Sequence, residues 1–121
     1  MSTHSGIAFV NSDGSVKSIY CHNDGYPSYM FNMLVDYYNS AELAESLVDL
    51  GDLSSVQKNI WSESHSFDHP IKDTTIAYHR DRGEDYCQNK WSNLDEYLNN
   101  AVSSYCADYL YYFKDGRWEY K

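Results

Sequence analysis

The sequence predicts a single α+β domain whose sheet is mainly antiparallel, with about three helices packed on one face of it. The 121 residues have the length of one ordinary domain. Two Asp-Gly pairs that lie between apolar runs predict two β-hairpins, one near each end of the chain. Between these hairpins, apolar residues recur at helical spacing. Hairpins with helices between them are typical of the α+β class. We expect the domain to span residues 1–121, with residues 1–5 as a loose N-terminal tail.

The first predicted hairpin covers residues 6–22. Residues 7–10 and 15–21 form its two apolar runs, and the Asn-Ser-Asp-Gly sequence of residues 11–14 forms its turn. The second strand carries apolar side chains on both faces, because Val16 and Ile19 alternate along it. This strand can therefore be covered on both sides.

Two amphipathic helices are predicted after this hairpin. Pro27 suits the first turn of a helix, where its missing N–H costs nothing. Ser40 can cap the second helix, and Gly51 is the expected left-handed residue that ends it. The apolar residues at helical spacing are Met30, Met33, Leu34, Tyr37 and Tyr38 in the first helix and Leu43, Ala44, Leu47 and Leu50 in the second.

The second half of the chain is predicted to alternate between loops and shorter elements. Residues 52–55 form a turn and residues 62–73 a loop, while residues 56–61 fit either a short strand or a helical turn. Residues 74–79 are β-branched and aromatic, which predicts a central strand between the two hairpins, ended by the polar run 80–85. A sequence close to a capping box at residues 92–95 begins another helix. The last hairpin spans residues 109–120, with an Asp-Gly turn.

The net charge of the chain favours some classes of binding partner over others. Its net charge is −9, from 18 acidic and 9 basic residues. This charge disfavours direct binding to nucleic acid or to an anionic membrane, because phosphate groups are bound by Lys and Arg. It favours a protein partner with a basic surface, through long-range attraction. Tyrosine occurs 13 times, and Tyr is common in interfaces as well as in cores.

The cysteines and the apolar runs indicate in which cellular compartment the protein acts. Three cysteines at wide spacing argue against a disulfide framework and for a reducing cytoplasm. Cys21 and Cys106 lie beside apolar and aromatic residues and are predicted to be buried, while Cys87 follows acidic residues that would raise its thiol pKa. No apolar run approaches the roughly 20 residues of a membrane helix. Residues 2–5 lack the basic and apolar regions of a signal peptide.

Two polar loops at predicted strand ends form a candidate pocket. If the loops converge, their His and Asp side chains would form acid–base pairs, and their Arg side chains would bind an anion such as a nucleotide or phosphoester. The alternative is structural, since Asp and Gly are turn residues and alternating Arg and Asp form surface ion pairs. No residue is predicted to be catalytic. The candidate pocket residues are His22, Asp24, Tyr26, His79, Arg80, Asp81 and Arg82.

No metal site and no cofactor are predicted. His65 and His69 have the i, i+4 spacing of helical metal ligands, but they lie among Ser, Asp and Pro residues that disfavour a helix. The chain also has no CxxC and no HExxH motif.

A candidate interaction surface lies on the two consecutive helices. From residue 18 to residue 56 the chain has no Lys or Arg, so the outer faces of these helices are predicted to carry unrelieved negative charge. Such a surface can dock on a basic groove of another protein. The alternative is that the charge only keeps the protein soluble. The candidate surface residues are Asp36, Tyr37, Tyr38, Glu42, Glu45 and Asp49.

Three blocks of the sequence resemble a family of small, uncharacterised proteins of tailed bacteriophages. The first is SIYCHNDGYP at residues 18–27, and the others are LGDLSS at residues 50–55 and AYHRDRGE at residues 77–84. The resemblance does not extend beyond residue 85. It implies an accessory protein that acts in the host bacterial cytoplasm, and the family offers no known activity to carry over to this chain.

Three function hypotheses follow. The first is a non-enzymatic phage protein that binds and modulates a host protein with a basic surface, and its favoured form is inhibition of a nucleic-acid-handling or defence enzyme such as a restriction or CRISPR-type nuclease. The second is a protein that binds or hydrolyses a nucleotide or phosphoester in the candidate pocket. The third is a structural or assembly role in the virion. None of them includes direct contact with nucleic acid or a membrane.

Overall fold

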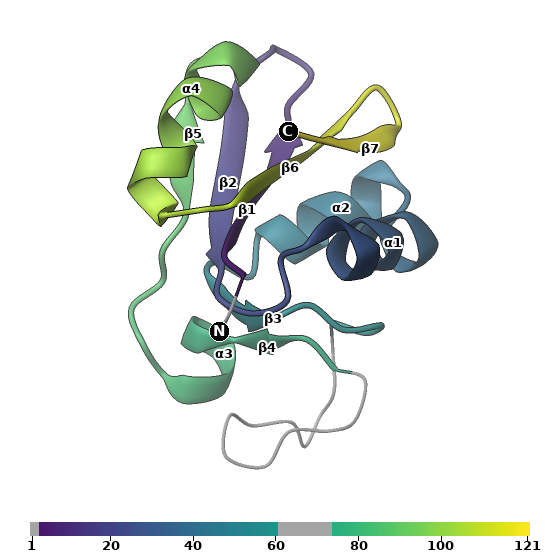
Figure 1. The fold of residues 1–121 in the computed structure, drawn as a ribbon, viewed down its shortest axis with the longest axis vertical. Helices are drawn as coiled ribbons and strands as arrows, with labels where there is room; N and C mark the ends of the chain where they lie inside the picture. The colour runs from purple at the N-terminus through teal and green to yellow at the C-terminus, as the bar shows by residue number, and fades with distance from the viewer. Residues whose placement is uncertain (1–2, 61–73) are drawn as a thin grey trace.

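The computed structural model describes residues 3–60 and 74–121. Within these ranges the chain forms one sheet of seven strands with four helices around it (Figure 1). The elements in chain order are β1 (Ser5–Val10), β2 (Val16–Cys21), α1 (Pro27–Tyr37), α2 (Ala41–Val48), β3 (Leu53–Ser55), β4 (Ile76–Ala77), α3 (Tyr78–Arg82), β5 (Asn89–Trp91), α4 (Leu94–Tyr105), β6 (Tyr109–Lys114) and β7 (Arg117–Tyr120).

The sheet has the strand order β4-β3-β2-β1-β6-β7, and β5 pairs with the first half of β2. Four strand pairs are antiparallel, namely β1–β2, β2–β5, β3–β4 and β6–β7. Two pairs, β1–β6 and β2–β3, are parallel. The predicted α+β class with a mainly antiparallel sheet is therefore confirmed.

Both predicted hairpins are present, and both belong to this sheet. The β1–β2 turn is closed by a hydrogen bond from the Asn11 N–H to Ser15 O at 2.8 Å, and Gly14 has a φ of +91°. In the β6–β7 turn, Asp115 and Gly116 both have positive φ, at 53° and 82°. Two central residues with positive φ match the right-handed twist of the flanking strands, which explains why Asp-Gly is a good hairpin signal.

The helices cover both faces of the sheet, and the prediction that they share one face is wrong. α1 and α2 pack against Ile7 and Ile19 on one face. α4 packs against Ala8 and Val16 on the other, so that the sheet lies between the two groups of helices (Figure 1). The physical reason is that consecutive residues of a strand point to opposite faces, and β1 and β2 carry apolar side chains on both.

The helix boundaries follow the predicted capping residues with one shift. α1 begins at Pro27, the Ser40 side chain accepts the Leu43 N–H, and Gly51 has a φ of 83°. The N-cap of α4 is Asn93, one residue after the expected position, and its side chain accepts the Glu96 N–H.

The strand predicted at residues 74–79 is mostly not a strand. Only Ile76–Ala77 form β4, at the edge of the sheet rather than at its centre, and the next five residues form α3. The Asp81 carboxylate accepts the Ala77 N–H at 2.8 Å, and Gly83 ends the helix with a φ of 76°. These local bonds outweigh the β propensity of the sequence. The predicted turn at residues 52–55 is largely the strand β3, and β5 was not predicted.

The start of the described chain is held in place. Thr3 O accepts the Gly25 N–H, His4 O accepts the Asp108 N–H, and Ser5 begins β1. Residues 3–5 are therefore not a loose tail, and residues 1–2 lie outside the described residues. None of the described helices combines the length and the apolar character that crossing a membrane requires.

Candidate binding site

The first polar loop of the candidate pocket, residues 22–27 and here called the first motif loop, forms an aromatic contact with the start of the described chain. The Tyr20 hydroxyl lies 2.7 Å from His22 Nδ1, and the His22 ring stacks on His4 with centroids 4.7 Å apart. Asp24 has a left-handed backbone with a φ of 57°. The N-cap of α1 is Tyr26, whose side chain makes no capping bond, and this exposed ring lies 6.1 Å from Tyr29. The loop therefore connects β1, β2 and α1.

The second polar loop of the candidate pocket, residues 79–85 and here called the second motif loop, is largely the helix α3. Its side chains stabilise that helix. His79 Nδ1 lies 2.8 Å from Glu84 O, and Arg80 donates to Asp81 and to Thr75 O. The Asp81 side chain is only 2% exposed and holds the Ala77 N–H. Arg82 pairs with Glu84 at 3.3 Å on the surface.

The two motif loops follow β2 and β4, which lie on either side of β3 in the sheet. In the described ranges, however, the side-chain contacts of His22 and Arg80 do not join the two loops. The His22 N–H bonds to Leu53 O in β3, and Leu53 pairs with Ala77, the residue before α3. The side-chain contacts of His22 nevertheless lead to Tyr20 and His4, whereas Arg80 donates to Asp81, to Thr75 O just before β4 and to Ile60 O. The candidate pocket is conditional on the two loops converging, and these hydrogen bonds and ring contacts of His22 and Arg80 in the described ranges do not join the loops.

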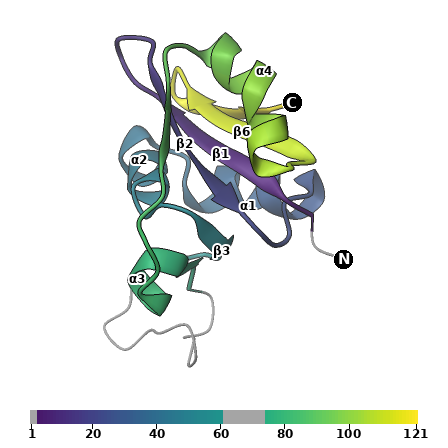
Figure 2. The same cartoon turned by 90° about the vertical axis from the view of Figure 1, so that its left-hand side faces the viewer.

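Two adjoining hollows lie instead beside Asp52, between the segment 83–89 and the ends of α4 and β2. Figure 2 shows the connection from α3 toward α4 running along this side of the molecule. The first hollow has a volume of about 490 Å³ and is lined by His4, Tyr20, Asp52, Cys87, Asn89, Ser104, Tyr105 and Cys106. The second has a volume of about 440 Å³ and is lined by Asp52, Tyr78, Gly83, Glu84, Asp85 and Cys87. The two share Asp52 and Cys87.

Backbone hydrogen bonds hold Asp52 in place between the two hollows. Its N–H donates to Cys87 O at 3.0 Å, and its carbonyl accepts the Tyr78 N–H at 3.2 Å. The carboxylate accepts the Tyr20 N–H at 2.9 Å. Gly51, with its positive φ, allows the chain to turn sharply from α2 into β3 so that Asp52 can reach all three partners.

The Asp52 carboxylate is half-buried, and residues 3–60 and 74–121 place no counter-ion beside it. Burial raises its pKa, and the hydrogen bond from the Tyr20 backbone lowers it to a smaller extent. No Lys, Arg or His side chain in residues 3–60 and 74–121 forms an ion pair with it. A half-buried carboxylate with one hydrogen bond loses hydration that the protein does not replace. A cationic ligand would replace it.

The surroundings of Asp52 are anionic and aromatic. Burial raises the pKa of the Cys87 thiol, and the charges that raise it further are Asp52, Asp85 and Glu84. The rings of Tyr20 and Tyr105 lie 5.9 Å apart on the wall of the larger hollow. Carboxylates beside aromatic faces are the usual environment for an ammonium or guanidinium group.

The cysteines differ in part from the prediction. Cys21 is fully buried, and burial raises its pKa to about 12, as expected for an inert thiol. Cys106 was predicted to be buried but is exposed. It ends α4 in the left-handed conformation with a φ of 50°, and this turn directs it toward the surface. Cys87 is also exposed.

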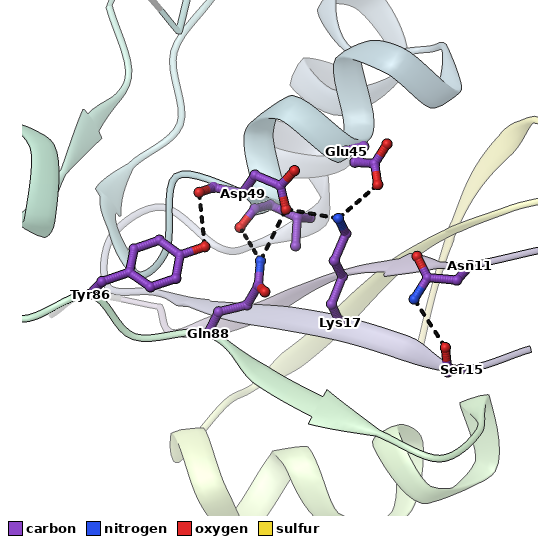
Figure 3. A network of polar contacts seen from close by, with 8 residues as sticks. Asn11, Ser15, Lys17, Glu45, Asp49, Tyr86 and Gln88 are labelled. Carbon is purple, nitrogen blue, oxygen red and sulfur yellow. Dashed lines mark hydrogen bonds and ion pairs between the residues drawn. The ribbon is translucent and has the colours of Figure 1, made fainter.

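Lys17 relieves part of the charge on the candidate interaction surface. Its ammonium group reaches from β2 to Glu45 at 2.7 Å and to Asp49 at 2.8 Å (Figure 3). Tyr86 and Gln88 approach the same end of α2, and Tyr86 donates its hydroxyl proton to Asp49 O. The prediction of unrelieved charge on α2 is therefore wrong for Glu45 and Asp49, because the counter-ion comes from a different element.

The aromatic part of that surface is also smaller than predicted. Tyr38 is 1% exposed, and its hydroxyl donates to Gln57 O and contacts the Thr75 hydroxyl, so this residue belongs to the core. Tyr37 is 40% exposed and lies under the Lys58 ammonium group. The predicted surface residues that remain exposed without an ion pair in the described ranges are Asp36, Tyr37 and Glu42.

Asp52 is the site residue that the sequence did not reveal. Its only local signal is its position between Gly51, which ends a helix, and the apolar Leu53, and that position equally fits a turn. Among the described residues, no group of three or more His, Cys, Asp and Glu side chains is arranged to hold a metal ion. His65 and His69 lie outside the described residues. Comparisons with known protein families, curated proteins and solved structures gave no match to this chain.

Proposed function

We propose that this chain is a non-enzymatic binding protein that docks on a basic surface of another protein, and that Asp52 receives a Lys or Arg side chain of that partner. The observation that carries the proposal is the half-buried Asp52 carboxylate, which has no ion-pair partner in the described ranges. A partner's cation in the adjoining hollow would supply the missing charge.

The net charge of the chain also supports docking on a basic surface. With a net charge of −9, the protein attracts a basic surface over long range, which raises the association rate. Glu84 and Asp85 line the smaller hollow and extend the negative surface beyond Asp52. The exposed Tyr86 ring beside them adds apolar contact area. The proposed surface is therefore acidic and rich in tyrosine, as the sequence indicated, but it is centred on Asp52 rather than on α1 and α2.

The resemblance to phage proteins extends the proposal to a class of partner. A host enzyme that handles nucleic acid, such as a defence nuclease, has a basic groove that an acidic protein can occupy. The binding protein would then act in the host bacterial cytoplasm and inhibit that enzyme by covering the groove.

The phosphoester hypothesis has less support from the geometry. Arg80 already donates to Thr75 O and Asp81, and Arg82 pairs with Glu84. The carboxylates of Asp52, Glu84 and Asp85 around the hollows would repel a phosphate. No described contact favours a role in the virion.

The test is a pull-down from bacterial lysate with the tagged protein as bait, followed by binding kinetics on the recovered partner. Asp52→Asn removes the charge but keeps a side-chain oxygen for the Tyr20 N–H. We expect this variant to weaken binding about 10-fold or more, mainly through faster dissociation. Asp95→Asn, an exposed residue at the start of α4, is the matched control, since it changes the net charge equally. Equal losses in both variants, or none in Asp52→Asn, would remove Asp52 from the interface.

A further inference from the structure

β7 is the last strand of the sheet, and its outer side has no strand partner among the described residues. Leu110 and Lys121 exchange both backbone hydrogen bonds, so the alternation of an antiparallel pair gives the next such pairs at Tyr112–Glu119 and Lys114–Arg117. The backbone N–H and C=O groups of Trp118 and Tyr120 therefore point away from β6. They are available to another strand.

A hollow beside β7 shows that this edge is open. It has a volume of about 370 Å³ and is lined by Phe31, Arg117, Trp118, Glu119 and Tyr120. Consecutive residues of a strand point to opposite faces, so a hollow that touches all four residues of β7 must lie along the strand's edge. β7 also lies at the periphery of the molecule in Figure 1.

The charges of β7 are complementary to those of an identical strand. In an antiparallel pair of two β7 strands centred on Trp118, Arg117 of one copy faces Glu119 of the other, and this contact occurs twice. Both side chains are exposed, at 73% and 42%, and they form an ion pair with each other within one copy at 3.5 Å, so pairing of two strands adds the two cross-strand contacts to this intrachain one. Opposite charges directly across a strand pair are stabilising. A pair centred on Glu119 would instead place Glu119 against Glu119.

The same register also fits the apolar side of the strand. Tyr120 is 46% exposed and lies 5.1 Å from the Phe31 ring. In the pair centred on Trp118, Tyr120 lies across from the β6–β7 turn of the second copy, where Gly116 has no side chain and the place of a Cβ has no neighbouring atom within 4 Å. The Tyr120 ring can lie over this glycine without a clash, and Trp118 exchanges both backbone hydrogen bonds with Trp118 of the second copy.

We propose that two copies of this chain associate through antiparallel pairing of their β7 strands, centred on Trp118. The pairing is isologous, so it closes as a dimer and leaves no further edge for growth at this strand. It is independent of the Asp52 site, and either proposal can fail without the other.

The test is analytical ultracentrifugation of wild type and charge variants at protein concentrations up to about 1 mM, the range in which weak association is measurable. Arg117→Glu and Glu119→Arg each place like charges across the pair, so each variant should be monomeric. The double variant Arg117→Glu with Glu119→Arg restores opposite charges and should dimerise as wild type does. An equimolar mixture of the two single variants should form heterodimers, because all its cross-strand contacts are Glu–Arg.

Circular dichroism of each variant is the folding control, and these exposed side chains should leave the spectrum unchanged. A wild type that is monomeric throughout the concentration range would overturn the proposal, and so would single variants that dimerise as well as wild type. A double variant that stays monomeric would also overturn it, because the charges then would not act in this register. If only an extended peptide of another protein pairs with β7, the wild type alone remains monomeric, which again rejects self-association.

Discussion

The Lys17 ammonium group lies 2.8 Å from the Asp49 carboxylate, joining β2 to the end of α2. The Lys17 side chain is 15% exposed, whereas Glu45 and Asp49 are about half exposed. Burial lowers the Lys17 pKa, but the hydrogen bonds and charges of Asp49 and Glu45 raise it by more, so the net shift is upward. Lys17 is therefore charged at neutral pH, and its ion pairs fix α2 against the sheet.

Replacing Lys17 by Met should lower the free energy of unfolding by about 0.5–1 kcal/mol, because partly exposed ion pairs contribute modestly. The measurement is urea unfolding at low salt and at 1 M salt, and the difference from wild type should shrink at high salt. Lys90→Met is the control, since Lys90 lies directly across from Lys17 in the β2–β5 pair and is exposed. A loss as large in the control would mean that the ion pairs of Lys17 contribute nothing specific.

Asp52→Asn should stabilise the fold while it weakens binding. Burial raises the Asp52 pKa in the folded state above its ordinary value of 3.8. The stability that this site contributes is therefore complete below that ordinary value and is lost as the pH rises through the raised pKa. Asparagine avoids this loss, so the variant should gain stability over wild type between about pH 3 and pH 7.

Urea unfolding of both proteins across this pH range is the measurement. A variant that becomes less stable than wild type as the pH rises would show that the carboxylate is paired with a cation in the folded protein. A gain in stability together with a loss of binding is typical of a residue kept for function.

Tyr38→Phe should lower the free energy of unfolding by about 0.5–1.5 kcal/mol, because it removes a hydrogen bond to Gln57 O, although the Thr75 hydroxyl still donates to that carbonyl. The Tyr38 hydroxyl joins α1 to Gln57 O and to the Thr75 hydroxyl. Tyr37→Phe, at the neighbouring exposed position, should change stability little. Thermal unfolding of the two variants checks this, and equal effects would place both hydroxyls in the same environment.

A thiol reagent should label Cys87 and Cys106 in the folded protein and Cys21 only after unfolding, since Cys21 is buried and the other two are exposed. Burial raises the pKa of the Cys87 thiol, so its labelling should accelerate as the pH rises above 7. Mass spectrometry of labelled peptides identifies the sites. Rapid labelling of Cys21 at low denaturant would contradict the packing of β2 against α1.

The parts of the fold that the sequence predicted are those with local causes. Asp13-Gly14 and Asp115-Gly116 set their own turns, and Pro27 and Ser40 begin their helices through bonds or dihedrals within a few residues. The short strands β3, β4 and β5 depend on partners far along the chain, and their two or three residues carry no readable period.

The candidate site was predicted less well, for the same reason. The hollows beside Asp52 combine side chains from β2, from the segment that follows α3 and from the end of α4, and no spacing in the sequence indicates that these meet. Tyr37 and Tyr38 are neighbours on one helix, so periodicity alone could not decide which one faces the core. The basic partner of Glu45 and Asp49 lies more than twenty residues earlier in the sequence, outside any helical window.

The parallel pairing of β1 with β6 has a consequence for synthesis. Ser5 pairs with Tyr109, so the middle of the sheet joins the two ends of the chain. The chain must leave the ribosome as far as residue 113 before β6 can pair fully with β1, and until then the nascent β1–β2 hairpin exposes an apolar edge. A chain stopped before residue 109 would therefore present that edge to chaperones or to other unfinished chains.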